Sequence, residues 1–318
     1  MLSHKKISWY KYTYEANTNK LVSVLENAAG SPTLGFKDGA TAATEYDYDE
    51  YGNMTGDLNK GIPFTVGSGK GIVYNHLGLP LKVTYATGTV EYTYDAGGTR
   101  MKKVITSGST IETTDYLYGW QYKNSVLQFF PTSEGYVKNT LVGTVNNYNY
   151  VFQYKDHLGN VRISYGINNA GVLKIMEENN YYPFGMKHDN YNTQTYAFTI
   201  SGSTSDLTAA TPDNQYKFGG KELQPELGFY DFSARNYDPA LGRWMNIDPM
   251  AETSTRWSPY VYTQNNPVYF TDPDGKQIQP MDSKGRNLYG PDGWYLPSWQ
   301  RAPASKDPAD RVTILKDN

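Results

Sequence analysis

Residues 90–104 read "VEYTYDAGGTRMKKV". Val90, Tyr92 and Tyr94 alternate with polar residues, and this period of two is typical of a half-buried β-strand. The "DAGG" that follows supplies an aspartate that hydrogen-bonds its own backbone and glycines that tolerate positive φ. Because "TRMKKV" then continues as a second extended run, the stretch predicts a tight antiparallel β-hairpin.

The same pattern returns elsewhere in the chain. "YDEYGN" begins at residue 48, "YNHLGL" begins at residue 74, and a longer version, "YKDHLGNVRISY", spans 154–165. The glycines of the first three units lie 26 and then 20 residues apart, so the array is irregular rather than a solenoid of fixed period. A lone hairpin is marginal in water, so we expect neighbouring hairpins to pair into one sheet.

The predicted fold is therefore all-β, with antiparallel hairpins over most of residues 40–275 forming a curved or spiralling sheet. Tyrosines of one parity should form cross-strand ladders, each pair contributing roughly 0.2–1 kcal/mol. Helix should be confined to short stretches such as 169–178. An ordinary β-sandwich built from tyrosine-rich strands is the alternative. Turns are expected at five glycines: Gly52, Gly78, Gly98, Gly159 and Gly242.

Composition narrows the classes of partner and cofactor. The 318 residues include 30 tyrosines and no cysteine, and the net charge of −3 comes with scattered basic residues. We therefore expect no nucleic-acid partner and no thiolate site. The four histidines lie in separate turns or loops without metal-ligand spacing, so no metal or other cofactor is predicted. No apolar run approaches the ~20 residues of a membrane span.

The N-terminal residues lack the apolar stretch of a signal peptide, so none is expected in this chain. The opening "KYTYEANTNKLVSV" begins in the middle of the hairpin pattern, which predicts a fragment of a longer product.

Three segments near the C-terminus carry the most specific motifs of the chain. They read "ARNYDPALGRW" at 234–244, "SPYVYTQNNPV" at 258–268 and "TDPDG" at 271–275. Together with the hairpin motifs they resemble the YD-repeat, or RHS-repeat, family. The region around them, residues 216–276, is similar to the RHS repeat-associated core segment that closes the repeat shells of that family.

The resemblance implies a four-part organisation. Residues 1–200 correspond to YD/RHS-type β-hairpin repeats, and residues 201–215, which are polar and of low complexity, form a linker. Residues 216–276 are the core segment. Residues 277–318 are a short variable tail, expected to be either the stub of a degraded cargo or a peptide lodged in the shell.

In this family the sheet winds into a hollow shell, the core segment cuts the chain after its last motif, and the C-terminal toxin stays enclosed. The resemblance thus implies the encapsulating module of an RHS-type polymorphic toxin, secreted or cell-surface associated in its full-length form. Its implied partners are its own C-terminal cargo, missing N-terminal repeats, and a secretion-system or immunity protein. The alternative is a non-cleaving cell-surface or adhesion protein that binds glycan or protein through its tyrosine-lined sheet.

The family's self-cleavage is attributed to core aspartates and an arginine, which correspond here to Arg235, Asp238, Asp248 and Asp272. The cut is expected near Gly275/Lys276, and this aspartyl self-cleavage is the enzymatic activity that the resemblance implies. Two carboxylates that share a proton can cut a peptide bond, because one activates water and the other protonates the leaving amine.

Asp248 is the expected acid–base residue, because the apolar run "WMNI" before it favours a low-dielectric environment. The alternative for each aspartate is a purely structural turn, since Asp-Pro steps commonly start turns.

The first of the two DPxG-type motifs departs from the family pattern. It reads "DPMA", so that Ala251 stands where the family has glycine, and 20 residues separate it from "DPDG". This interval is longer than the family's usual one, and Lys276 stands in place of a leucine. The departures bear on cleavage and leave the predicted fold unchanged.

Overall fold

The computed structural model describes residues 10–26, 36–65, 70–188 and 194–280, and the β-strand is the main element throughout these ranges. The described residues contain no α-helix, only four short 3-10 turns. The strands are β1 Tyr10–Tyr14, β2 Leu21–Glu26, β3 Tyr46–Tyr48, β4 Met54–Asp57, β5 Ile72–Tyr74, β6 Pro80–Tyr85, β7 Gly88–Tyr94, β8 Arg100–Ser107, β9 Thr110–Leu117, β10 Trp120–Lys123, β11 Val126–Thr132, β12 Gly135–Val142, β13 Val145–Lys155, β14 Val161–Ile167, β15 Leu173–Glu178, β16 Tyr196–Ser201, β17 Thr204–Ala209, β18 Glu222–Gln224, β19 Phe229–Asp231, β20 Asn236–Asp238, β21 Arg243–Trp244, β22 Phe270–Thr271 and β23 Gln279–Pro280.

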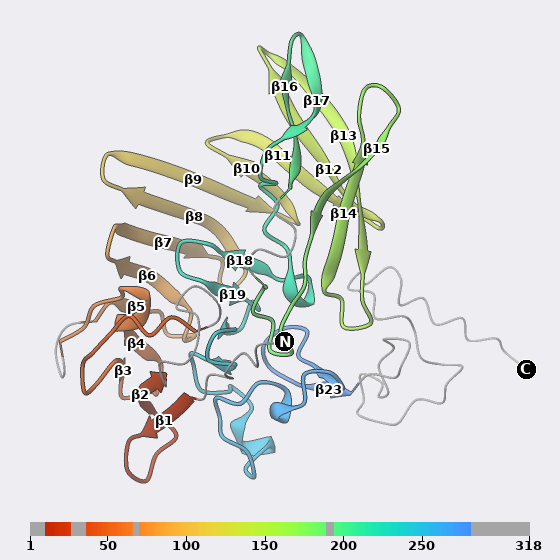
Figure 1. Ribbon diagram of the computed structural model, residues 1–318. Helices are drawn as coiled ribbons and strands as arrows, with labels where there is room; N and C mark the ends of the chain where they lie inside the picture. Colours follow the sequence, from red (N-terminus) through yellow and green to blue (C-terminus); the bar gives the residue numbers. More distant parts are fainter. Residues whose placement is uncertain (1–9, 27–35, 66–69, 189–193, 281–318) are drawn as a thin grey trace, which may run out of the picture.

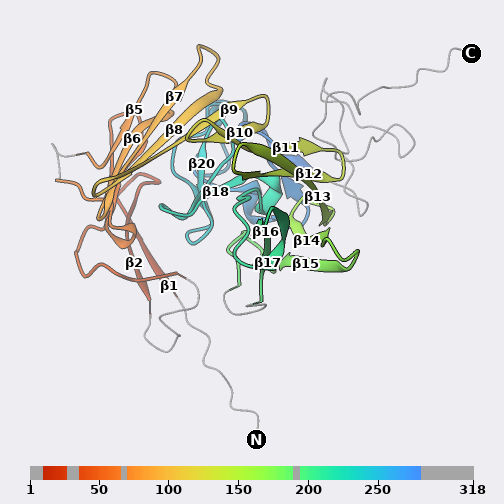
Figure 2. The same ribbon diagram turned by 90° about the horizontal axis from the view of Figure 1, so that it is seen from above.

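Eleven of the strands, β5 to β15, form one sheet in which each strand pairs with its neighbours in sequence (Figure 1). Every pairing is antiparallel, as in β12 and β13, where Gly135 lies opposite Phe152 and Val142 opposite Val145. The sheet curves strongly and does not close on itself (Figure 2). The predicted all-β antiparallel hairpin architecture is therefore confirmed.

One hydrogen-bond pattern explains why an acidic or amide residue and a glycine recur in the hairpins. Asp95 Oδ1 accepts bonds from the backbone N–H groups of Gly97 (2.9 Å) and Thr99 (2.8 Å). Gly98, at φ 84°, donates its N–H to the Asp95 carbonyl. The turn needs this positive φ, which glycine adopts without a Cβ penalty. All five glycines predicted to lie in turns have positive φ.

Tyrosines of one parity do face the same side, as predicted. The ring centroids of Tyr92 and Tyr94 are 6.3 Å apart, and Tyr92 is buried. The Tyr94 hydroxyl donates to the Pro80 carbonyl at 3.0 Å, and the Tyr74 hydroxyl donates to the Met54 carbonyl. The buried phenols thus obtain the polar partners that their burial requires.

Two local predictions were wrong. Within the segment 169–178, which was expected to be helical, residues 173–178 form β15, which pairs along β14. The side chain of Asn168 caps a turn before it, and pairing with the open edge of β14 outweighs the helix propensity of "LKIMEE". The expected linker 201–215 contains β17, which pairs with β16 and buries Leu207.

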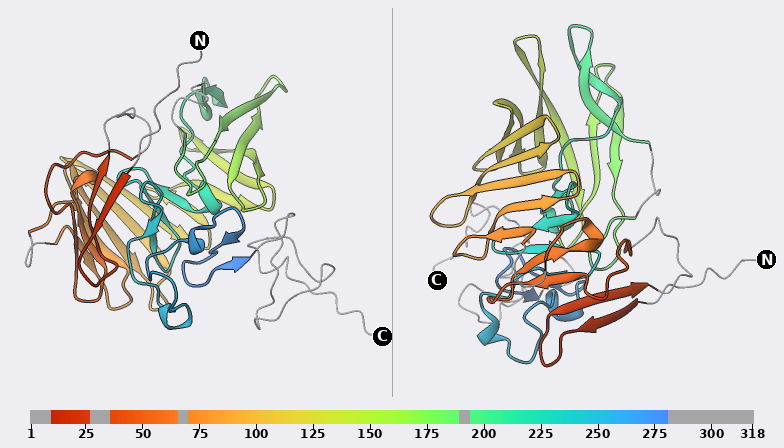
Figure 3. Two further views of the ribbon diagram at one scale, coloured as in Figure 1. Left: turned by 60° about the horizontal axis from the view of Figure 1, so that its bottom comes forward. Right: turned by 90° about the vertical axis from the view of Figure 1, so that its left-hand side faces the viewer.

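The segment 216–276, the predicted core segment, lies on the concave side of the curved sheet, between its two ends (Figures 2 and 3). Polar contacts fix it there: Arg100 of β8 is paired with both Glu222 and Asp231. An aromatic cluster forms its own interior, composed of Phe218, Tyr230, Phe232, Tyr237, Trp244 and Tyr262. This cluster and the surrounding turns position the residues of the candidate site.

Within the part of the chain that the structure describes, no helix has the length and apolarity needed to cross a bilayer. Residues 281–318 of the predicted tail lie outside the described ranges.

Candidate functional site

Arg235 lies at the centre of the candidate site. It precedes β20 in the turn that follows β19, and it is only 2% exposed. Its guanidinium carbon lies 4.1 Å from the centroid of the Trp244 ring, a cation–π contact that also fixes the plane of the guanidinium. The aromatic cluster therefore holds a permanently charged group in a nearly water-free position.

Two of the three predicted aspartates meet at this arginine. Asp248 Oδ2 and Asp272 Oδ2 each lie 3.2 Å from Arg235 Nη2. Asp272 is 1% exposed, whereas 21% of the Asp248 side chain is exposed. One carboxylate is thus enclosed and the other is open to solvent, an asymmetry that suits two different roles in proton transfer.

Arg235 and Asp272 also contact the predicted cleavage point, which is the peptide bond between Gly275 and Lys276. Arg235 Nε donates to the Gly275 carbonyl oxygen at 2.5 Å. Asp272 Oδ1 accepts from the Gly275 N–H at 2.8 Å and from the Lys276 N–H at 3.1 Å. A cation therefore contacts the carbonyl oxygen of this bond, and a carboxyl group contacts its nitrogen.

Burial sets the protonation of the site. Desolvation raises the pKa of Asp272, although Arg235 opposes this rise. The neighbouring charges of Asp274 and Asp248 raise it further. Burial also lowers the pKa of Arg235, but a guanidinium stays charged at neutral pH. Asp272 therefore retains a proton to higher pH than an exposed aspartate does.

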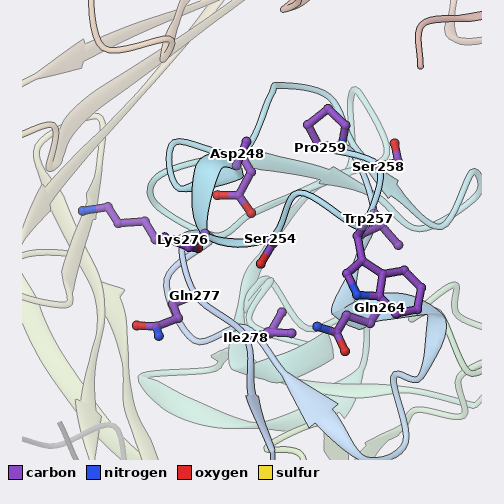
Figure 4. Close-up of a pocket in the computed structure, with 12 residues that line it drawn as sticks. Asp248, Ser254, Trp257, Ser258, Pro259, Gln264, Lys276, Gln277 and Ile278 are labelled. Carbon is purple, nitrogen blue, oxygen red and sulfur yellow. The ribbon is translucent and has the colours of Figure 1, made fainter. Parts of the chain in front are cut away.

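A pocket of about 250 Å³ opens beside this bond (Figure 4). Asp248 and Lys276 lie on its wall, and the Asp248 carboxylate extends toward Ser254 in Figure 4. Trp257, Gln264 and Ile278 complete much of the lining. The pocket thus provides space for a water molecule next to the exposed carboxylate.

Asp238 lies in a different cluster. Its Oδ2 is 3.4 Å from Lys60 Nζ, and its Oδ1 accepts from the backbone N–H groups of Ala240 and Leu241. The structure therefore brings Arg235, Asp248 and Asp272 together but places Asp238 elsewhere, because the "PALG" turn directs its carboxylate toward the first repeats. Sequence reasoning also missed Trp244, although its place in "GRW" after a turn indicated a buried aromatic.

Among the described residues, no group of three or more His, Cys, Asp and Glu side chains is arranged to hold a metal ion.

Comparisons with known proteins place this geometry in context. No protein-family model matches the chain. Over 205 residues it is 30% identical to salivary gland surface protein 1 of Aedes aegypti, covering 59% of this chain and 5% of that protein. Over 288 residues it is 26% identical to the tRNA3(Ser)-specific nuclease WapA of Bacillus spizizenii, and the match covers 68% of this chain and 12% of the nuclease.

A third relative is the toxin subunit YenC2 of Yersinia entomophaga, 33% identical over 116 residues, which cover 36% of this chain and 10% of the subunit. The chain thus spans only between 5% and 12% of the length of these relatives.

A crystal structure described as TcdB2-TccC3-TEV superposes on this chain with a TM-score of 0.52 and 17% sequence identity. The superposition covers 84% of this chain and 13% of the chain in that structure. This likeness shows a shared fold. The sequence relatives include proteins named as toxin subunits and nucleases, which agrees with the resemblance to RHS-type toxins.

Proposed function

We propose that this chain is part of the encapsulating shell of an RHS-type polymorphic toxin and that it cuts itself between Gly275 and Lys276. The observation that carries the proposal is a pair of hydrogen bonds to this one peptide bond. Arg235 donates to its carbonyl oxygen, and Asp272 accepts from its N–H. The bond follows "DPDG", where the family resemblance expects the cut.

The arrangement supports hydrolysis by two carboxyl groups. Asp248, which lines the pocket, removes a proton from a water molecule that attacks the Gly275 carbonyl carbon. Arg235 Nε stabilises the negative charge that develops on the carbonyl oxygen. Asp272 Oδ1 accepts the Lys276 N–H before the reaction. Once attack has made that nitrogen pyramidal, Asp272 passes its proton to the nitrogen lone pair as the carbon–nitrogen bond breaks, which leaves a Gly275 carboxylate and a free amine on Lys276.

These roles differ from the expectation at one point. Sequence reasoning assigned the proton-holding role to Asp248, but Asp272 is the more deeply buried carboxyl and the one whose pKa burial raises. Asp248 is more exposed and borders the pocket, so it suits the base. In this proposal Asp248 and Asp272 form the acid–base pair, and Asp238 takes no part in the cleavage.

Mass spectrometry of the purified full-length chain tests the cleavage. We expect a fragment that ends at Gly275, and we expect Asp248→Asn and Asp272→Asn to give only the uncut 35.8 kDa chain. Asp238→Asn is the matched control, because this buried aspartate of the same segment contacts Lys60 instead. Cleavage that persists in Asp272→Asn, or that depends on Asp238 alone, would refute the assignment.

The shell role rests on the curvature of the sheet and on its open edges. β5 and β15 end the eleven-stranded sheet, so further repeats can pair there. The core segment lies on the concave side, where a plug of an enclosed space would lie (Figure 2). In this proposal the full-length protein is secreted or surface-associated, and its partners are its cargo, further repeats, and a secretion-system or immunity protein.

A second candidate is a non-cleaving adhesion module, and an aromatic strip on the sheet favours it. Trp120 stacks on Phe130 at 4.3 Å, and Phe130 contacts Tyr148 at 6.3 Å. Tyr148 and Tyr150 are exposed, at 54% and 63%. Aromatic faces of this kind bind sugars and proteins. If the wild-type chain stays intact, and if it binds a glycan array through Tyr148 and Tyr150, this second function replaces the first.

A further inference from the structure

A second buried ionic cluster joins the first repeats to the core segment. Asp57 ends β4 and caps the 3-10 turn η1, Leu58–Lys60, and its Oδ1 accepts from the Lys60 N–H at 3.2 Å. The Lys60 ammonium lies 3.4 Å from Asp238 Oδ2. One short turn therefore holds a lysine and a carboxyl group together, and a carboxylate from far along the chain meets them.

The cluster is nearly sealed from water. Asp57 and Asp238 are each 1% exposed, and 17% of the Lys60 side chain is exposed. The Lys60 ammonium lies 5.0 Å from the centroid of the Phe229 ring. Gly228 permits this approach, because a Cβ at that position would lie 3.2 Å from Lys60 Nζ. The lysine is thus enclosed by apolar surface and by backbone without a side chain.

The polar groups of the cluster are poorly satisfied as ions. The Lys60 ammonium is paired with Asp238, and the buried Asp57 carboxyl lies close by, where it accepts the Lys60 backbone N–H. Among the described residues, neither Asp57 Oδ2 nor Asp238 Oδ2 has a hydrogen-bond partner. The spacing of 3.4 Å is also longer than the roughly 2.7–2.9 Å of a charge-assisted hydrogen bond. Buried charges that are incompletely paired are costly, so the cluster is strained as an ion pair.

We propose that Lys60 and Asp238 condense into an isopeptide bond, with Asp57 as the acid–base residue that moves the protons. Lys60 Nζ attacks the Asp238 carboxyl carbon, and a carbon–nitrogen bond forms as one carbon–oxygen bond breaks. Asp57 takes a proton from the ammonium and passes it to the departing oxygen. Two of the three ammonium hydrogens leave with that oxygen as water, so an ammonium and a carboxylate become a neutral amide.

The surroundings favour each part of this step. Burial raises the pKa of Asp57 to about 7; Lys60 opposes this rise, and Asp238 adds to it. Near neutral pH Asp57 is therefore present in both protonation states, as a proton carrier requires. The amide also removes two buried charges at once, so the low-dielectric environment that penalises the ion pair favours the product.

The geometry separates this pair from ordinary ion pairs of the molecule. Lys82 and Glu91 lie 2.8 Å apart on neighbouring strands, but both side chains are about half exposed and water stabilises their charges. Arg100, which pairs with Glu222 and Asp231, has a guanidinium that is a poor nucleophile. Two other buried lysines, Lys103 and Lys217, are hydrogen-bonded to their carboxylate partners Glu226 and Glu177. The Lys60–Asp238 pair differs because Asp238 Oδ2 has no hydrogen-bond partner among the described residues.

The bond would link residues 60 and 238 and thereby close most of the repeat region into a covalent loop. Such a cross-link restricts the unfolded chain in the same way as a disulfide. This chain contains no cysteine and therefore has no disulfide available for that purpose.

Intact-mass measurement of the full chain under denaturing conditions tests the proposal. We expect the species that contains both residues, whether it is the uncut chain or the fragment that ends at Gly275, to weigh one water less than its own sequence mass, and we expect digestion to yield a branched peptide that joins Lys60 to Asp238. Lys82 and Glu91 serve as the control pair and should appear in separate linear peptides. A wild-type chain of full mass, with Lys60 and Asp238 in separate peptides, overturns the proposal.

Two variants identify the roles. Lys60→Arg keeps the positive charge and should show no loss of water. Asp57→Asn keeps an oxygen to cap η1, so the fold should persist, as checked by far-UV circular dichroism, while most of the chain remains unlinked. Water loss that is undiminished in Asp57→Asn would overturn the proton-transfer role of Asp57. None of these residues contacts the Gly275–Lys276 bond, so the outcome is independent of self-cleavage.

Discussion

Replacing Arg235 with alanine should destabilise the fold by about 3–5 kcal/mol at neutral pH, because it removes the cation from the buried Asp272 carboxyl. Asp272 is 1% exposed and cannot regain water when its partner is lost. The carbonyl of Gly275 also loses its donor, and Trp244 loses the stacked guanidinium. Since small domains have stabilities of about 5–15 kcal/mol, this loss should be large enough to measure reliably.

The cost should depend on pH in a defined direction. Burial already raises the folded-state pKa of Asp272, and Arg235 opposes that rise, so the variant should have a still higher pKa at this group. A carboxyl with a raised folded-state pKa contributes stability below its unfolded pKa of about 3.9 and loses it as pH rises through the folded pKa. The penalty should therefore be largest at neutral pH and shrink toward about 1–2 kcal/mol in acid, where only contacts are lost.

Urea unfolding of Arg235→Ala and the wild type at several pH values measures both effects. Arg256→Ala is the control, because Arg256 belongs to the same segment but is exposed, and its loss should change stability by no more than about 0.5 kcal/mol. A penalty for Arg235→Ala below about 1 kcal/mol, or one that does not change with pH, would contradict the view that the arginine neutralises the buried Asp272 carboxylate.

Three further predictions concern the repeats and the site. Tyr94→Ser should cost about 1–3 kcal/mol in urea unfolding, because it removes aromatic area and the bond to the Pro80 carbonyl, and a cost near zero would argue against a stabilising tyrosine ladder. Gly52→Ala should cost more than Gly108→Ala in thermal unfolding, because a Cβ at Gly52 would lie 2.4 Å from an Ile247 atom whereas the Gly108 site is open; equal costs would indicate that φ alone decides. The wild type should lose stability as the pH rises above about 4 and the buried Asp272 carboxyl ionises, and Asp272→Asn should reduce that slope; an unchanged slope would assign it to other groups.

The hairpins could be predicted from the sequence because their determinants are local. In "YDAGGT" the aspartate that caps the turn and the glycine at positive φ lie within four residues of each other. The conformation of these turns therefore depends little on tertiary contacts. Prediction failed at 173–178, where a segment with helix-forming residues pairs instead along the edge of β14. The edge of β14 is a tertiary feature, and a helical pattern in a short stretch of sequence carries no information about it.

The site was predicted in part for the same reason. Asp248 and Asp272 belong to recognisable motifs, so their candidacy was visible in the sequence, and the turn at "DPDG" places Asp272 beside the Gly275 and Lys276 amides. The partner of Asp238 was not visible, because Lys60 lies 178 positions earlier in an unremarkable "DLNK" turn. Long-range pairing of charges depends on how the sheet curves, which the hairpin pattern leaves open.

For each Asp-Pro step the sequence allowed either a structural turn or a catalytic role. In the structure the two oxygens of each carboxylate make different contacts, one within the turn and one with a cation. In all three steps Oδ1 accepts backbone N–H groups of its own turn, at Ala240, Met250 and Gly275. In all three, Oδ2 faces a buried or partly buried cation, which is Lys60 for Asp238 and Arg235 for the other two.

The turn therefore orients the carboxylate, and the cation that meets Oδ2 determines the chemistry. An arginine is a poor nucleophile and is not acylated under these conditions, so in the proposed function it organises hydrolysis of the adjacent peptide bond. A lysine in a water-poor cluster can be acylated, so the same Asp-Pro device leads there to bond formation. In the two proposals one local motif therefore serves opposite reactions, bond cleavage at Asp248 and Asp272 and condensation at Asp238, according to the side chain that the curved sheet brings to it.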